Sequence, residues 1–299
     1  MKGTLVPFFV SFFQSSLTLL KSLKSKIIQL LTGKDPVIMG ILNVTPDSFS
    51  DGGEFNRLES AVKHALQMQA EGAVIIDIGG ESTRPDAQPV DVEQELSRVI
   101  PVIKSLREQS DVFISIDTSK PEVMRCAIEA GANMINDVNA LRADGAIECC
   151  AELKVPVCLM HMQGEPRTMQ QNPEYGDVVK EVAAFLLERA RKCVEAGISR
   201  DGIMLDPGFG FGKTLAHNVQ LLSRLDDIVE LDFPVLVGFS RKSMLGAILG
   251  QPNQPRPVNE RLIASVTAAV IAYEKGARVF RVHDVAETAD ALKFCRAVQ

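Results

Sequence analysis

The 299-residue sequence lacks several features that would each assign it to a particular class of protein. It contains no Trp, only two Tyr and no tract of basic residues, and its formal net charge is −6. An acidic chain without a basic tract is a poor candidate for binding nucleic acid or an anionic membrane over its whole surface. Any anionic ligand would therefore need a local group of Arg, Lys or His side chains.

The six cysteines also lack the spacing of a metal framework. The sequence has no C-x-x-C pair, and no Cys is matched with His at zinc-finger spacing. Cysteines of this kind are typical of reduced thiols that fill the core of a cytosolic protein. We therefore predict a cytoplasmic protein without a structural zinc site.

Long apolar runs are absent as well. No uninterrupted run reaches the roughly 18–20 residues that a membrane-spanning helix needs, and no A-x-A-like cleavage site follows the first apolar segment. Residues 1–33 do carry apolar side chains at helical spacing, among them Phe13, Leu20, Ile27 and Leu31. The pattern fits a helix packed on the body, an interfacial amphipathic helix, or a leader added by an upstream start codon. We predict an amphipathic or disordered extension over residues 1–33, without chemistry and without firm membrane association.

From residue 34 to residue 299 the sequence repeats one supersecondary unit. Short strands rich in Val and Ile alternate with segments of helical periodicity, and four of these segments end at Gly before the next strand. The expected strands are Val37–Asn43, Val74–Ile78, Phe113–Asp117, Met134–Asp137, Val157–Met160, Ile203–Asp206, Val235–Gly238 and Val279–Val282. Right-handed crossovers between such strands build a parallel sheet. Eight units favour a single α/β domain, a (β/α)8 TIM barrel, over an open doubly wound sheet.

Two of the expected helices contain an informative proline. Pro101 lies inside a helical apolar pattern and is expected to kink that helix. Ser119 has the spacing of a capping box with Glu122, and Pro121 falls in the first turn. We therefore expect the Ser119 side chain to cap the second helix.

Polar residues follow nearly every expected strand. In a barrel of this type the active site lies at the carboxyl ends of the strands. The residues found there are Asn43, the segment from Gly79 to Arg84, Asp117, Asn136, Asp137, His161, Asp206, the segment from Ser240 to Lys242, Arg281 and His283. A role in starting a turn explains one or two of them, such as Asp137 and Ser119, but not the whole set. The sequence therefore predicts a functional site at this face.

The acceptors and amides of this set suit a flat heterocycle. Asp117, Asn136 and Asp206 are short side chains at strand ends, and they can pair with the donor edge of an amino-pyrimidine ring. Leaving such donors unpaired would cost about 1–3 kcal/mol each, so the pairing gives selectivity.

The cations of the set suit an anion. Arg84, Lys242, Arg281 and His283 supply the local positive charge that a group such as pyrophosphate needs. Asn43 offers an oxygen ligand of the type that Mg²⁺ prefers. Together these residues predict an anionic leaving group beside a bound heterocycle.

The Gly-rich stretch from Pro207 to Thr214 resembles a phosphate-binding P-loop only in its Gly-Lys-Thr ending. Pro207 stands where the P-loop spacing needs Gly, and the dinucleotide-binding spacing fails too, so an NTPase is disfavoured. Phe209 and Phe211, in a loop that we expect to be flexible, suit either an apolar wall for a ligand or core packing.

The polar segments resemble those of dihydropteroate synthases from about residue 35 to the end of the chain. The matching stretches are ILNVTPDSFSDGG, DIGGESTRP, ISIDTSKPEV, INDV, LMHMQG, LDPGFGFGK, FSRKS and RVHDV. They occur in order at the ends of successive strands, which makes the resemblance specific. Members of that family have the same barrel. With Mg²⁺, they condense 6-hydroxymethyl-7,8-dihydropterin pyrophosphate with p-aminobenzoate to give 7,8-dihydropteroate and pyrophosphate in folate biosynthesis.

The resemblance implies a role for each matched residue. It implies pterin binding by Asp117, Asn136, Asp206 and Lys242; pyrophosphate binding by Asn43, Thr83, Arg84, Arg281 and His283; and a p-aminobenzoate pocket of Phe49, Pro85, Phe211 and Ser240. It further implies Asn43 as the Mg²⁺ ligand, and Asp117, Lys242 and Arg281 as the catalytic residues. The loops that carry residues 43–53 and residues 83–84 are then expected to close over the leaving group, and the protein is expected to be a homodimer.

Two departures and two alternatives accompany this resemblance. Residues 1–33 do not belong to the family core, and Asp86 stands where many members have Gly, which leaves the stiffness of that loop open. A non-catalytic pterin-binding paralogue would be expected to have lost some of the matched loop residues. A pterin-dependent methyltransferase domain would share the barrel but would have no use for the anion site.

Overall fold

The computed structural model describes residues 26–45, 54–82, 88–251 and 254–299, with the backbone alone for residues 54–56. Its centre is one parallel sheet with the strand order β6-β5-β4-β3-β2-β1-β8-β7. The strands are β1 (Val37–Asn43), β2 (Ile75–Gly79), β3 (Phe113–Asp117), β4 (Met134–Asp137), β5 (Val157–Met160), β6 (Ile203–Asp206), β7 (Leu236–Val237) and β8 (Val279–Val282). A parallel bridge between Leu205 and Val235 joins the two edges and closes the barrel.

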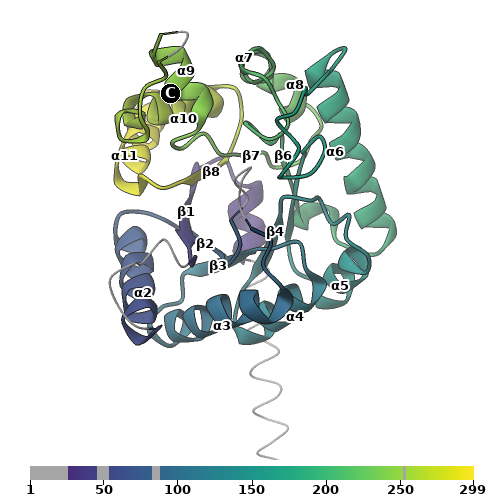
Figure 1. Cartoon of the computed structure of the whole chain (residues 1–299), viewed down its shortest axis with the longest axis vertical. Coiled ribbons are helices and arrows are strands. Elements are labelled where there is room, and N and C mark those ends of the chain that lie inside the picture. The colour runs from purple at the N-terminus through teal and green to yellow at the C-terminus, as the bar shows by residue number, and fades with distance from the viewer. Residues whose placement is uncertain (1–25, 46–53, 83–87, 252–253) are drawn as a thin grey trace, which may run out of the picture.

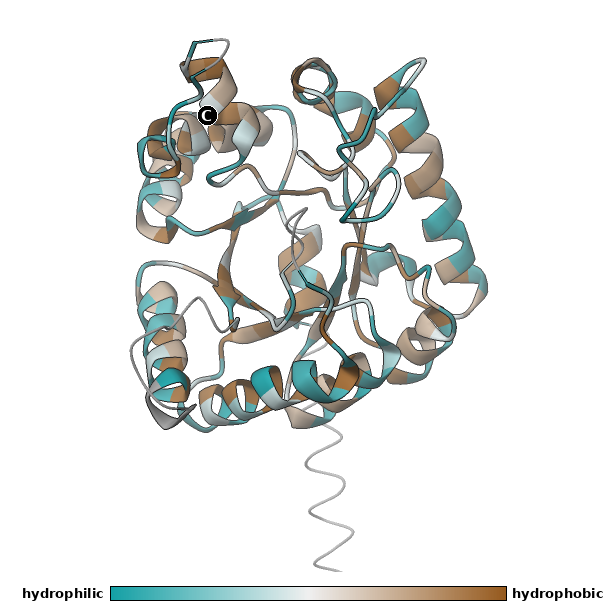
Figure 2. Ribbon diagram, in the orientation of Figure 1, coloured by the Kyte–Doolittle hydropathy of each residue, from teal (hydrophilic) through white to brown (hydrophobic). Residues whose placement is uncertain are grey.

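Helices surround the strands, as Figure 1 shows. They are α2 (Glu54–Ala70), α3 (Val92–Gln109), α4 (Pro121–Ala130), α5 (Ala146–Leu153), α6 (Val178–Glu195), α7 (Leu215–Ser223), α8 (Leu225–Val229), α9 (Ser243–Leu249), α10 (Leu262–Glu274) and α11 (Val285–Ala297). Hydrophobic residues run along the strands, whereas most of the surrounding helices mix hydrophobic and hydrophilic residues (Figure 2). The predicted TIM barrel is confirmed, because α/β alternation and a closed parallel sheet are its defining features.

The apolar core of the described residues has two main parts and a small third cluster of Met160, Met162 and Met169, against which Phe211 packs. The larger part lies between the sheet and the helices, where outward-facing strand residues such as Ile76, Ile114 and Leu205 pack against the helices. The smaller part fills the barrel interior at the amino ends of the strands, where Met39, Met134 and other inward-facing side chains meet. Burying a side chain of this size contributes about 1.5–3 kcal/mol.

Residues 26–32 are helical and close the amino-terminal end of the barrel. Ile27 is 0% exposed and Leu31 is 1% exposed, and both pack into the smaller core with Val37 and Met39. This segment lies within the ring of strands in Figure 1, coloured purple. Of the earlier interpretations of residues 1–33, packing on the body therefore describes the part from residue 26 onward. None of the described helices is long and apolar enough to span a membrane.

The strand limits differ from the predicted ones in two places. Strand β2 begins and ends one residue later than predicted, and it includes Gly79 because this residue pairs with both Asn43 and Asp117 in the sheet. Strand β7 is shorter than predicted, because its pairing with β6 is limited to the isolated bridge at Val235.

The capping box predicted for Ser119 is wrong. Lys120 is the N-cap of α4 and no side chain caps this helix, although Pro121 does occupy its first position. Ser119 instead donates its hydroxyl to the buried carboxylate of Asp137. Pro101 lies inside α3, which runs without a break from Val92 to Gln109, and the kink expected at Pro101 stays a prediction.

Candidate active site at the carboxyl ends of the strands

Neighbouring strands bring several predicted site residues side by side. The sheet register pairs Asn43 with Gly79, Gly79 with Asp117, and Asp117 with Asn136. A Cβ atom added at Gly79 would lie 3.5 Å from Cβ of Asp117 and 3.8 Å from Oδ1 of Asn43. Glycine therefore keeps open the space between the Asn43 amide and the Asp117 carboxylate.

Arg281 is held inside the barrel by two carboxylates. Its Nε donates to Oδ2 of Asp77 at 2.6 Å, and its Nη2 donates to Oδ2 of Asp117 at 2.7 Å. Burial by itself would lower the pKa of Arg281, but the charges of Asp77 and Asp117 raise it above its usual value. Arg281 is therefore a permanent cation at the base of the site.

Asp77 is a site residue that the sequence analysis missed. Its side chain is 0% exposed, and the same Oδ2 that binds Arg281 also accepts a hydrogen bond from Nδ2 of Asn136 at 3.1 Å. One carboxylate oxygen thus orients two predicted ligand-binding side chains. The signal was present in the sequence, since Asp77 interrupts the apolar strand Ile75–Gly79 at an inward-facing position.

Asp117 can exchange partners more easily than Asp77, because 10% of its side chain is exposed. Burial raises the pKa of Asp117 to about 7, against the lowering effect of Arg281. The carboxyl group therefore takes up a proton more readily than an exposed aspartate does. A group in this state can accept a hydrogen bond from a ring N–H or carry a proton itself.

Asp206 and Lys242 form the opposite side of the site. Burial raises the pKa of Asp206, whereas the ammonium group of Lys242 lowers it. Burial also lowers the pKa of Lys242 to about 8. The Nζ atom of Lys242 donates to the backbone oxygen of Phe209 and lies 4.7 Å from the centre of the Phe211 ring.

The Gly-rich loop after β6 is held much more firmly than expected. Lys213 is 3% exposed, and its Nζ atom donates to the backbone oxygens of Gly208 and Phe211, both at 2.9 Å. Gly208 has φ +68°, and a Cβ atom added there would lie 1.9 Å from the His161 oxygen. The expectation of a flexible loop is therefore wrong, because tight packing and bonded carbonyls fix its path. The lysine also points into the protein, which is not the arrangement of a P-loop. Of its two phenylalanines, Phe209 is the core residue, with 0% exposure.

Ser240 and His283 lie together at the ends of β7 and β8. The Oγ atom of Ser240 lies 3.0 Å from Nδ1 of His283 and accepts a hydrogen bond from the His283 backbone N–H at 3.2 Å. Asp284 pairs with Arg241 at the same corner. Ser240 is 8% exposed, and its hydroxyl is hydrogen-bonded to His283, so it positions His283 in this structure.

Two polar strand-end residues prove to be separate from this group. Asp137 is 0% exposed and accepts hydrogen bonds from the backbone N–H groups of Asn139 and Leu141, so it starts a turn as one interpretation predicted. The His161 ring lies 5.0 Å from the Phe185 ring of α6, on the outer side of the sheet. Five predicted or discussed residues, Phe49, Thr83, Arg84, Pro85 and Asp86, lie outside the described residues.

A metal site built from protein side chains alone is not found in the described part of the chain. No group of three or more His, Cys, Asp or Glu residues there could hold a metal ion. Asn43, whose amide oxygen lies on the other side of Gly79 from Asp117, still fits the way in which Mg²⁺ is often bound, with water and substrate phosphate as its other ligands.

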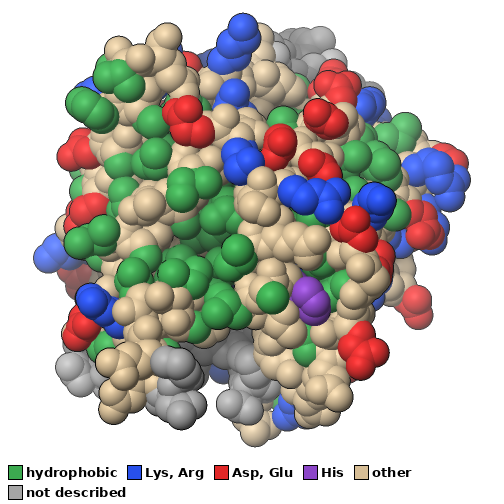
Figure 3. Space-filling model, turned by 90° about the horizontal axis from the view of Figure 1, so that it is seen from above, with side chains coloured by type: hydrophobic (Ala, Val, Ile, Leu, Met, Phe, Trp, Pro, Cys, Tyr) green, Lys and Arg blue, Asp and Glu red, His purple; other side chains and the backbone are tan. Residues whose placement is uncertain are grey.

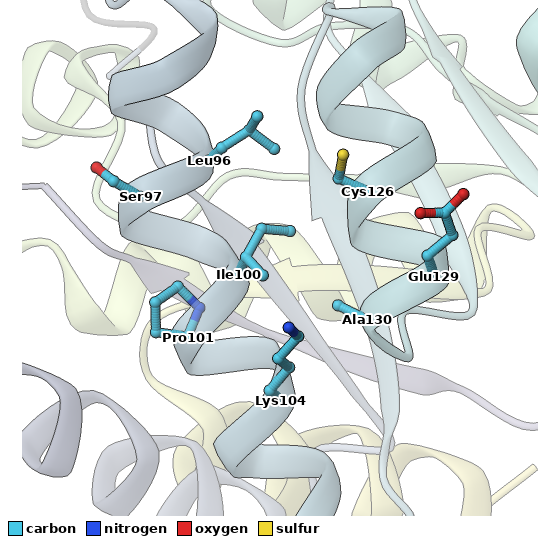
Figure 4. A pocket seen from close by; sticks show the side chains of 8 residues that line it. All are labelled: Leu96, Ser97, Ile100, Pro101, Lys104, Cys126, Glu129 and Ala130. Carbon is cyan, nitrogen blue, oxygen red and sulfur yellow. The ribbon is translucent and has the colours of Figure 1, made fainter.

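A separate groove lies on the outside of the barrel between α3 and α4, with a volume of about 540 Å³ (Figure 4). Leu96, Ile100, Lys104, Cys126 and Glu129 are among the residues that line it. These residues belong to the outer helices, so the groove is not part of the strand-end group.

A family model, curated relatives and solved structures all match this chain, and they agree with one another. The family described as pterin binding enzymes matches residues 39–283. The dihydropteroate synthase of Escherichia coli (strain K12) is 53% identical over 262 residues, which is 88% of this chain and 91% of the relative. The structure of Xanthomonas albilineans dihydropteroate synthase with 4-aminobenzoic acid is 52% identical, with a TM-score of 0.83 and coverage of 89% of this chain and 93% of that one. The same enzyme in complex with 7,8-dihydropteroate has a TM-score of 0.80, 50% identity and coverage of 89% and 94%.

Proposed function

The chain belongs to the pterin binding enzyme family, and we propose that it condenses 6-hydroxymethyl-7,8-dihydropterin pyrophosphate with p-aminobenzoate, the reaction of a dihydropteroate synthase. The observation that carries this function is the charged cluster inside the barrel, where Asp117 and Asp206 lie at the carboxyl ends of the strands with Arg281 and Lys242. Acceptors for a heterocycle and cations for an anion thus come together. The similarity to dihydropteroate synthases favours this reaction over that of a methyltransferase.

The pterin ring is assigned to Asp117, Asn136, Asp206 and Lys242. Asp117 is exposed enough for a ligand to reach it, while Asp77 keeps its hold on Arg281. This division lets the pterin N–H groups replace Arg281 as the donor to Asp117, while Asp77 still holds the guanidinium. An unpaired buried donor would cost about 1–3 kcal/mol, so these carboxylates select a ring with adjacent N–H groups.

The pyrophosphate is assigned to Asn43, Arg281 and His283, together with Thr83 and Arg84. A Mg²⁺ ion at Asn43, when bound, would offset the negative charge of the leaving group. Asn43 would hold the ion through its side-chain oxygen, which is the donor type that this cation prefers. Arg281 stabilises the same charge through its fixed guanidinium, an electrostatic contribution that is often the largest in catalysis.

The reaction then needs no protein nucleophile. The bond between the pterin methylene carbon and the pyrophosphate oxygen breaks, and its electron pair leaves with the pyrophosphate. The amine nitrogen of p-aminobenzoate forms the new bond to that carbon and loses one proton. Phe211 and Ser240, with Phe49 and Pro85, are the residues proposed for the p-aminobenzoate pocket, and the Lys242 cation above the Phe211 ring favours a carboxylate nearby.

We also propose a homodimer that forms through α9, α10 and α11. Ile263 of α10 is 80% exposed and Phe294 of α11 is 71% exposed. Hydrophobic side chains gather over part of the face in Figure 3, on the side where Figure 1 has α9 and α10. Exposed apolar patches of this kind mark protein interfaces. The six free cysteines support a cytoplasmic location, where thiols stay reduced.

Pyrophosphate release tests the proposed reaction. The protein with both substrates and Mg²⁺ should release pyrophosphate and form 7,8-dihydropteroate, and omission of p-aminobenzoate should abolish product. Lys242→Ala should lower turnover at least roughly 100-fold, since it removes a buried cation of the site. Lys180→Ala is the matched control, because that side chain on α6 is 78% exposed. Retained pterin binding without any pyrophosphate release would instead indicate a non-catalytic binding protein.

A further inference from the structure

Lys213 is a buried ionisable side chain that the proposed reaction leaves without a role. An ammonium group has three N–H donors. Two of them donate to the backbone oxygens of Gly208 and Phe211, each at 2.9 Å, and Nζ lies 3.0 Å from Nδ1 of His161. Burial lowers the pKa of Lys213 to about 7, and burial with the charge of Lys213 lowers the pKa of His161 to about 3. The two side chains therefore share one hydrogen bond, whose donor depends on the protonation of Lys213. The hydrogen bonds of the Lys213 Nζ atom are therefore all made inside the protein.

The loop beside Lys213, residues 208–212, will be called the Phe-Gly loop. Each of its five backbone oxygens accepts a hydrogen bond from a side chain. The donors are Lys213 to Gly208 and Phe211, Lys242 to Phe209, Gln170 to Gly210 at 2.6 Å and Tyr175 to Gly212 at 2.7 Å. Lys213 is the one donor of this set that holds two points of the loop, and it also ties the loop to the end of β5.

The Phe-Gly loop is part of the wall of the site. The Gly208 N–H donates to Oδ1 of Asp206 at 2.7 Å, and the Phe211 ring lies 4.7 Å from Nζ of Lys242. The loop thus joins the pterin side of the site to the aromatic wall. Lys213 itself is 3% exposed and is held beneath the loop.

We propose that Lys213 is a positioning residue for the aromatic amine substrate. It fixes the Phe-Gly loop so that the Phe211 ring is already in place before p-aminobenzoate arrives. A preorganised wall raises affinity, because binding no longer has to order the loop. This inference rests on the proposed function, since it assigns Lys213 to the second substrate of that reaction.

Loss of Lys213 should affect the two substrates unequally. Asp206 lies on β6 and is held by strand pairing, so its position depends little on the loop. Phe211 lies in the middle of the loop and loses the hydrogen bond to its own backbone oxygen. The affinity for p-aminobenzoate should therefore fall more than the affinity for the pterin.

Steady-state kinetics of Lys213→Met test this role. Met keeps the length and apolar stem of Lys but donates no hydrogen bond. We expect KM for p-aminobenzoate to rise roughly tenfold, because the Phe-Gly loop would then have to be ordered when this substrate binds. The kcat and the KM for the pterin substrate should change less than about threefold. Arg189→Met is the matched control. Arg189 is 9% exposed and donates to the backbone oxygens of Ala140 and Leu141 in another loop, so its loss should lower the melting temperature and leave KM unchanged.

The outcomes separate this inference from the proposed function. A wild-type protein that forms no dihydropteroate contradicts the proposed function, whatever the variants do. An active wild type with unchanged KM for p-aminobenzoate in a folded Lys213→Met protein contradicts the inference alone, as does an equal rise in Arg189→Met. If Lys213→Met does not fold, Tyr175→Phe decides. That variant removes only the hydrogen bond to Gly212, and it should raise KM for p-aminobenzoate by about two- to threefold. An unchanged KM there overturns the inference.

Discussion

The two ends of the barrel interior are formed by the same strands but by opposite kinds of side chain. At the amino ends, Met39, Ile75, Met204 and Val279 point inward and meet Leu31. Two residues further along the strands, the inward-facing positions carry Asp77, Asp206 and Arg281 instead. Successive inward-facing residues of a strand are two positions apart, so β2, β6 and β8 change from apolar to charged within one step.

This contrast separates stability from function within one barrel interior. The amino end buries apolar surface, which stabilises the fold. At the carboxyl end, burial raises the pKa of Asp117 to about 7 and lowers the pKa of Lys242 to about 8, so charged groups are held there in unfavourable surroundings. Such perturbed groups are typical of functional sites. Substitutions at one end should therefore change catalysis, and substitutions at the other end should change stability.

The largest expected effect is on catalysis, from Asp206→Asn at the carboxyl end. The substitution keeps the shape but removes the negative charge that would accept N–H donors of the pterin. We expect kcat/KM to fall at least roughly 100-fold, because hydrogen bonds to charged groups contribute about 1.5–3 kcal/mol each. The melting temperature should stay the same or rise, since burial disfavours this carboxylate. A large loss of stability with normal kcat/KM would contradict the separation of the two ends.

The next effect is on stability, from Leu31→Ala at the amino end. Leu31 is 1% exposed, so the change should leave a cavity and lower the free energy of unfolding by about 2–5 kcal/mol. Denaturant titration measures this loss, and kcat of the folded protein should be unchanged. Leu187→Ala on α6 is the control, because Leu187 is 41% exposed. Equal losses for the two variants would show that residues 26–32 do not close the barrel.

A pH-dependent change in the free energy of unfolding is expected from His161→Gln, at the carboxyl end of β5 on the outer side of the sheet, and not from Leu31→Ala. The folded protein keeps the pKa of His161 at about 3, whereas the unfolded chain has the ordinary value near 6.5. Below pH 6.5 the unfolded chain therefore takes up a proton that the folded protein does not. The stability advantage of the wild type over His161→Gln should be largest above pH 6.5 and should shrink as the pH falls toward 3. Leu31→Ala removes no titratable group, so its stability difference should be the same at every pH. A constant difference for His161→Gln would contradict the depressed pKa.

The smallest effect is expected from Arg296→Ala. Nη2 of Arg296 lies 2.8 Å from Oδ1 of Asp35, next to the segment that closes the amino end. The side chains are 58% and 61% exposed, so water screens the pair and it should contribute about 0–1 kcal/mol. Urea unfolding should show a loss far smaller than that of Leu31→Ala. A comparable loss would mean that this ion pair, rather than apolar packing, holds residues 26–32 in place.

Much of the fold could be predicted because local patterns and burial agree. Six of the eight strands have the predicted bounds, since their apolar runs and the turns that follow them are both local signals. Strands β2 and β7 differ, because pairing with neighbouring strands decides where a strand ends. The chain position of Asp117, Asn136, Asp206 and Arg281 was also predictable, since the carboxyl ends of parallel strands meet at one face.

The sequence patterns failed where a side chain bonds to a distant partner. Ser119 had the spacing of a helix cap, but its hydroxyl reaches Asp137 from the next strand. The glycines of the Phe-Gly loop suggested flexibility, because glycine allows many backbone conformations. Its carbonyls are nevertheless bonded by Gln170, Tyr175 and Lys242, which come from other parts of the chain.

The sequence by itself determined the repeated strand–helix pattern, the barrel, and the polar residues that follow each strand. These features depend on periodicity and on the order of residues along the chain. Only the tertiary structure decided that Asp77 supports Arg281 and Asn136, and that Lys213 is turned inward beneath its loop. A buried charge must find its partners in space, and those partners lie on strands and loops that the barrel brings together from distant parts of the sequence.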